Sequence, residues 1–127
     1  MSEPIPVIKY SFDSCIPGSS AVTVTNEGSY TGMDGTFVKV NSGKYEIIQS
    51  ANSPTGKNYL SFTGGSSSNG AYISVPTFTF GGSAWSVCFW YNKAANTINE
   101  TSARIFDFST PVTAQKGFGL YFYGGTG

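Results

Sequence analysis

Hydrophobic and polar residues alternate along short stretches of the chain, which is the pattern of β-strands with one buried face. Near the start, Ile8, Tyr10 and Phe12 alternate with polar residues. Stretches of the same kind recur, separated by Gly, Pro, Asn and Asp residues typical of turns. The other expected strands are 21–25, 36–40, 44–49, 58–63, 70–75, 84–92, 103–109 and 117–123. Many short strands at this spacing predict an all-β sandwich or barrel.

Residues 92–104 include some helix-forming residues, but no apolar stripe is sustained there. We therefore expect a long polar loop. A length of 127 residues fits a single domain over 1–127, because one core typically occupies roughly 100 to 150 residues.

Alternation also predicts which face of each later strand is buried. In 84–92, 103–109 and 117–123 one face is strongly apolar, and we expect it to face the core. The predicted core residues of these strands are Trp85, Val87, Phe89, Tyr91, Phe106, Phe108, Phe118, Leu120 and Phe122. The opposite face carries four residues that form an aromatic strip with one carboxylate if the strands are neighbours. These candidate ligand-binding residues are Trp90, Asp107, Tyr121 and Tyr123.

Such a strip suits a glycan, because sugar rings offer C–H faces to aromatic rings and hydroxyls to carboxylates. An alternative is that loops, further strands or another subunit cover it. Both interpretations stay open at this point.

The charge content argues against several classes of function. Charged residues make up 11% of the chain and the formal net charge is zero, so a nucleic-acid partner is not expected. Histidine is absent, and no two acids lie at strand spacing i, i+2, so neither triad hydrolysis nor a paired-carboxylate mechanism is expected. No apolar run approaches the roughly 20 residues of a membrane span, and no secretory signal is visible. We therefore expect a protein that is not an enzyme and does not insert into membranes.

Two further features leave their meaning open. Cys15 and Cys88 are the two cysteines, and their spacing alone does not establish a disulfide. Asn99-Glu100-Thr101 matches the acceptor pattern for N-glycosylation, which matters only in a secreted protein or a modifying host.

The order of several segments resembles the laminin-G-like, or concanavalin A-like, lectin and glucanase superfamily. The matching segments are 10–13 (YSFD), 59–65 (YLSFTGG), 71–76 (AYISVP), 86–92 (SVCFWYN) and 104–109 (RIFDFS). The resemblance implies a two-sheet antiparallel β-sandwich, a jelly roll, with several strands beyond Tyr123. We therefore expect a stretch of a longer polypeptide, or a neighbour that supplies strands. It also implies a rim calcium ion, for which Asp13 and Asp34 are the suitable loop-end acids. The acid pattern of the family's hydrolases, Glu-x-Asp-x-x-Glu, does not occur here.

The expected function is a non-enzymatic, lectin-like module for adhesion or for carbohydrate or protein recognition, in an extracellular or surface-displayed protein. The alternative is a structural subunit, such as a coat, tail or appendage protein of a virion or another large assembly. Its expected partners are other subunits or further strands of a longer chain. Low charge and the expected missing strands favour this alternative.

Overall fold

The computed structural model describes residues 5–63, 69–79, 84–92, 103–109 and 117–122. The chain divides into two compact units, each described here by itself. The first unit is Met1–Gly64 with Ser68–Tyr91, and the second is Gly65–Ser67 with Asn92–Gly127. The expectation of a single domain over 1–127 stays a prediction.

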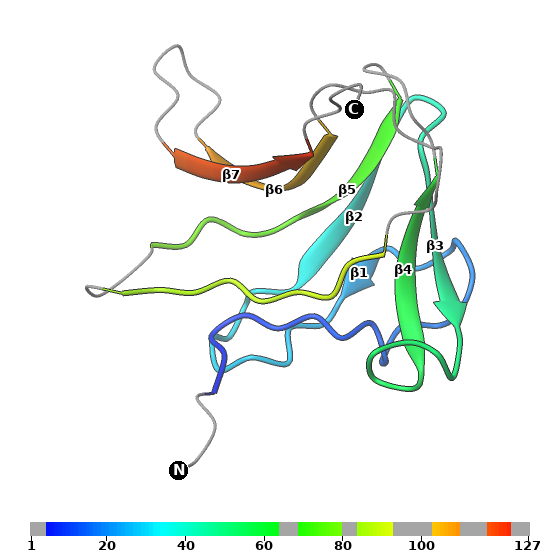
Figure 1. Ribbon diagram of the computed structural model, residues 1–127, viewed down its shortest axis with the longest axis horizontal. Coiled ribbons are helices and arrows are strands. Elements are labelled where there is room, and N and C mark those ends of the chain that lie inside the picture. Colours follow the sequence, from blue (N-terminus) through cyan, green and yellow to red (C-terminus); the bar gives the residue numbers. More distant parts are fainter. Residues whose placement is uncertain (1–4, 64–68, 80–83, 93–102, 110–116, 123–127) are drawn as a thin grey trace. The chain divides into compact units, whose positions relative to one another are not determined.

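The described part of the chain is all-β, with every strand pair antiparallel (Figure 1). This confirms the predicted class. The strands are β1 (Thr23–Val24), β2 (Gly35–Val40), β3 (Lys44–Gln49), β4 (Asn58–Thr63), β5 (Gly70–Ser74), β6 (Ala103–Ser109) and β7 (Gly117–Phe122). They form a three-stranded sheet β1-β2-β5 and the two-stranded sheets β3-β4 and β6-β7.

The first unit holds the sheet β1-β2-β5 and the ribbon β3-β4. Phe37 of β2 lies opposite Ile73 of β5, and Ile47 of β3 lies opposite Leu60 of β4. On its other side, Ile47 exchanges two backbone hydrogen bonds of 2.8 Å with Gly18. The segment around Gly18 therefore extends the ribbon by a single bridge.

The core of this unit is shared by the two sheets. Phe37 and Tyr45 alternate with exposed neighbours along β2 and β3, and their rings stack with centroids 4.6 Å apart. Ile47 and Val24 are fully buried beside them. Burial of one such aliphatic side chain contributes roughly 1.5–3 kcal/mol. The period-2 alternation predicted for these strands is confirmed here, and it places side chains of both sheets around one cluster.

A tight turn connects β2 to β3. Asn41 has a φ of 51°, and the Gly43 N–H donates to the carbonyl of Val40 at 3.0 Å. A Cβ atom on Gly43 would lie 1.8 Å from the carbonyl oxygen of Gly70, the first residue of β5. The turn can approach β5 this closely only because position 43 has no side chain.

The second unit contributes the hairpin β6-β7. Its register places Asp107 opposite Gly119, and an irregularity interrupts the pairing between Arg104 and Phe106. The rings of Phe106 and Phe108 lie 5.5 Å apart, as expected for neighbours on one face of a strand. Their predicted shared face is therefore observed.

Two predicted strands are wrong. Residues 8–12 form no strand, and Phe12 adopts a φ of 66°, which breaks the extended path, although Tyr10 and Phe12 still pack against the core. Residues 84–92 also carry no strand assignment, and all nine are exposed. Trp85, Val87, Phe89 and Tyr91 were expected in the core and are 39–53% exposed. Alternation buries a face only where a second layer covers it, and that layer cannot be deduced from the segment itself.

Candidate functional site

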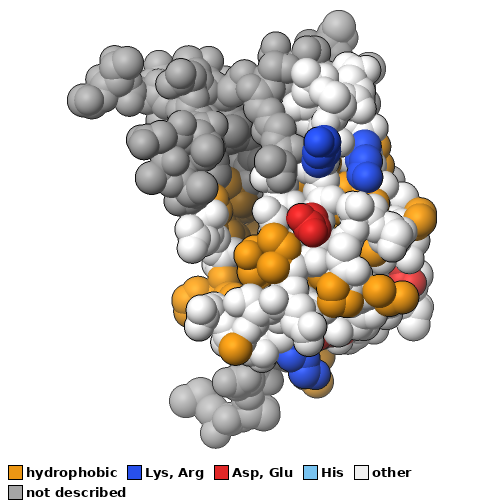
Figure 2. Space-filling model, turned by 90° about the vertical axis from the view of Figure 1, so that its right-hand side faces the viewer, with side chains coloured by type: hydrophobic (Ala, Val, Ile, Leu, Met, Phe, Trp, Pro, Cys, Tyr) orange, Lys and Arg blue, Asp and Glu red, His pale blue; other side chains and the backbone are white. Residues whose placement is uncertain are grey.

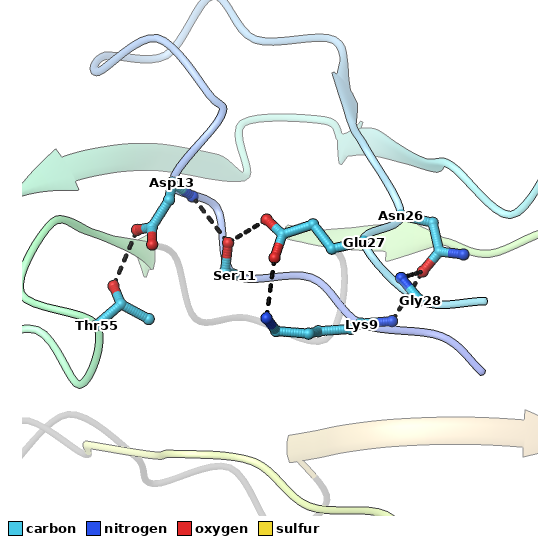
Figure 3. A network of polar contacts seen from close by, with 7 residues as sticks. All are labelled: Lys9, Ser11, Asp13, Asn26, Glu27, Gly28 and Thr55. Atoms are coloured by element: carbon cyan, nitrogen blue, oxygen red, sulfur yellow. Dashed lines mark hydrogen bonds and ion pairs between the residues drawn. The ribbon is translucent and has the colours of Figure 1, made fainter. Parts of the chain in front are cut away.

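A network of polar side chains joins the N-terminal segment to the rest of the first unit (Figure 3). The Lys9 ammonium lies 3.1 Å from the Glu27 carboxylate, and the Ser11 hydroxyl donates to the same carboxylate. The backbone N–H of Asp13 donates in turn to the Ser11 hydroxyl at 3.3 Å. Glu27 thus holds two residues of the N-terminal segment in place.

Asp13 continues this network toward the β3-β4 turn. One of its carboxylate oxygens accepts a hydrogen bond from the Thr55 hydroxyl at 2.9 Å and another from the Asn58 backbone N–H at 3.1 Å. The buried Asn58 amide donates to the carbonyls of Phe12 and Cys15, both at 3.1 Å. Asp13 and Asn58 therefore clamp the 12–15 turn against the start of β4.

Asn26 organises the other end of the network. Its amide oxygen accepts from the backbone N–H groups of Lys9 at 2.8 Å and Gly28 at 2.9 Å. Its own backbone N–H donates to the Asp34 carboxylate at 2.8 Å. Asp34 thus fixes a loop through a charge-assisted hydrogen bond.

Both predicted calcium ligands, Asp13 and Asp34, therefore accept hydrogen bonds from the protein, and they lie in different parts of the network. Within the ranges that the structure describes, no three His, Cys, Asp or Glu side chains gather closely enough to hold a metal ion. Calcium binding by Asp13 and Asp34 stays a prediction, and the observed role of both acids is to accept hydrogen bonds from neighbouring segments.

The exposed aromatic segment, residues 84–92, is the most apolar exposed stretch that is described. Trp90 is 85% exposed, and four further large hydrophobic side chains in the segment are at least 39% exposed. In Figure 1 the segment follows an extended path without a strand arrow. Alternation along an extended chain places Trp90 on the face opposite to Trp85 and Phe89.

The four residues of the predicted aromatic strip fall in different places. Trp90 belongs to the first unit, and Asp107 lies half-buried in β6 of the second. Tyr121 lies opposite Arg104 in the β6-β7 register, and Tyr123 lies outside the described residues. The strip as a single site stays a prediction, while the exposure of Trp90 is an observation.

The two cysteines are both free thiols. Cys15 is buried in the core, where burial, and to a smaller degree the charge of Glu27, raise the pKa of its thiol. Cys88 is exposed at the centre of the exposed aromatic segment. The open question of a disulfide between them is thus answered for this structure, in which they do not pair.

The surface seen from the β3-β4 side carries few charges. Figure 2 shows a few Lys, Arg, Asp or Glu side chains and several small groups of hydrophobic side chains, set among uncharged polar atoms on the described part of this face. Within the described ranges, no helix has the length and apolar character needed to cross a membrane.

Sequence reasoning missed the clamp made by Asp13, Thr55 and Asn58. The contacts join residues 42 to 46 positions apart, and no spacing or motif signals them.

Comparisons of the chain with protein-family models, with curated proteins and with solved structures give no match.

Proposed function

We propose that this chain is a non-enzymatic, lectin-like binding module that recognises its ligand through the exposed aromatic segment. The observation that carries the proposal is the 85% exposure of Trp90, in a stretch of nine residues without a single charge. Large exposed apolar patches on soluble proteins commonly mark interaction sites. We further propose that the fold is a two-sheet jelly roll of the laminin-G-like kind. Its support is the packing of β1-β2-β5 and β3-β4 around one core.

A glycan is the ligand that we propose first. The flat indole face of Trp90 suits the C–H face of a sugar ring, and Ser86 offers a hydroxyl group on the same face by alternation. The proposed setting is an extracellular or surface-displayed protein.

Glycan-array screening followed by titration of the strongest hit tests this proposal. Trp90→Ala is expected to weaken binding by about tenfold or more, because one aromatic anchor often dominates a small interface. Trp85→Ala is the matched control, since it removes the same ring from the opposite face. Absence of binding at high protein concentration, or equal affinity of Trp90→Ala and the unchanged chain, would remove the glycan proposal.

A second candidate function is that of a structural subunit in a virion or similar assembly. The observation that favours it is the breadth of the exposed apolar surface, because five of the fifteen large hydrophobic side chains that are exposed among the described residues lie in these nine positions. An extended, uncharged segment of this kind readily adds to the sheet edge of another chain.

A further inference from the structure

The exposed aromatic segment has a near-symmetric sequence centred on Cys88. Val87 and Phe89 flank the centre, and Trp85 and Tyr91 lie three positions away on either side. The segment contains no charged residue, no proline and no glycine. Uncharged stretches of this composition favour pairing between strands of different chains.

We propose that two copies of the chain associate through this segment, as antiparallel strands centred on Cys88. In this register Val87 lies opposite Phe89 of the second copy, and Trp85 lies opposite Tyr91 of the second copy. Both are apolar cross-strand pairs of the kind that stabilise sheets. The two-fold axis repeats each pair, which gives the self-complementary interface of a symmetric dimer.

The same register is the reason for proposing a second copy of the chain as the partner of this segment. It pairs all nine residues, whereas a shift that keeps the four apolar side chains of both copies on one face leaves Trp85 or Tyr91 without a cross-strand neighbour from the segment. The zero net charge of the chain adds no long-range repulsion between copies. In the paired strands of the dimer, successive side chains point to opposite faces. Trp90 of each copy therefore lies on the same face as Cys88 and can still bind a ligand. The dimer therefore goes beyond ligand recognition and does not depend on glycan binding.

A charge-swap experiment tests the register. Sedimentation velocity over a range of concentrations should show a monomer–dimer equilibrium for the unchanged chain. Val87→Lys is expected to raise the dissociation constant about tenfold or more, because an ammonium then faces Phe89 of the second copy at two symmetric positions. The double variant Val87→Lys with Phe89→Glu should recover much of the association, because each new ammonium faces a new carboxylate across the axis. Val22→Lys, at a side chain that is 67% exposed elsewhere in the first unit, is the control and should dimerise normally.

Oxidation of the unchanged chain is a second test that needs no folded variant. Directly opposed residues in a hydrogen-bonded antiparallel pair have Cα atoms about 5.5 Å apart, within the range of about 4.4–6.8 Å that a disulfide spans. Diamide should take two hydrogens from two Cys88 thiols and leave one interchain S–S bond, seen as a covalent dimer on a non-reducing gel. Cys88→Ser should abolish that dimer, and Cys15→Ser should not.

Three results would overturn the dimer: a monomer at all concentrations, aggregates without a fixed size, or a double variant that associates no better than Val87→Lys. These outcomes are separable from failure of the proposed function. A monomer that still loses glycan binding with Trp90→Ala would sink the dimer alone, while a Cys88-linked dimer without any glycan ligand would sink the glycan proposal alone.

Discussion

Replacement of Asn58 by Asp provides a sharp test of the clamp between the 12–15 turn and β4. The change keeps the shape of the side chain but replaces an amide group, which donates to two carbonyls at 3.1 Å, by an oxygen that cannot donate when ionised. Each lost hydrogen bond costs roughly 0.5–1.5 kcal/mol, and the buried carboxylate also faces two carbonyl oxygens. We expect the free energy of unfolding to fall by about 3 kcal/mol near neutral pH.

Urea denaturation followed by circular dichroism measures this loss, with Asn52→Asp as the control. Asn52 lies in the loop that precedes β4 and has an exposed side chain, so its replacement should change stability by less than about 0.5 kcal/mol. Burial should raise the folded-state pKa of the new carboxyl above its unfolded value of about 3.9, so the penalty of ionisation is full above the folded-state pKa, shrinks as the pH falls toward the unfolded pKa, and is absent below it. Equal stability of the two variants near neutral pH would refute the assignment of Asn58 as a buried double donor.

Three further predictions follow from the same unit. Gly43→Ala should lower the free energy of unfolding by about 2 kcal/mol or more, because its Cβ would overlap the backbone of Gly70, whereas Gly70→Ala, with open space around the new Cβ, should be nearly neutral. In the folded protein a maleimide should label Cys88 quickly and Cys15 slowly, as mass spectrometry of timed samples can show; equal rates would contradict the burial and the raised pKa of the Cys15 thiol. Burial raises the folded-state pKa of both Cys15 and Tyr10. Each group therefore contributes stability that is present below its unfolded pKa and is lost as the pH rises, so the melting temperature should fall above about pH 9. An unchanged melting temperature in alkaline buffer would contradict this expectation.

Much of the strand pattern could be predicted from alternation alone. The bounds of β3, β4 and β6 agree with the predicted 44–49, 58–63 and 103–109, because in each the apolar residues recur at every second position between turn residues. The same rule was wrong for 84–92, where the alternation is equally clear. A strand requires a regular ladder of backbone hydrogen bonds with a second strand, and the sequence of one segment contains no information on the register of a second strand.

The candidate site was less predictable than the fold. Asp13 and Asp34 stood out in the sequence as loop-end acids, but their hydrogen-bond partners come from other turns and loops that folding brings together. A carboxylate that accepts two N–H or O–H groups and one that binds a cation look alike in sequence, since both favour Asp beside a turn. Only the positions of the donors distinguish the two uses.

The distribution of apolar side chains points to a function at the exposed aromatic segment. Among the described residues, six hydrophobic side chains are buried and fifteen large ones are exposed. Ten of the exposed side chains are spread over the rest of the described chain, and such scattered exposure is normal for a folded protein. The other five occupy nine consecutive residues, none of which carries a charge. Contact with a ligand or a second copy would remove this surface from water without disturbing the core around Phe37, Tyr45 and Ile47, so recognition and folding can be altered separately by mutation.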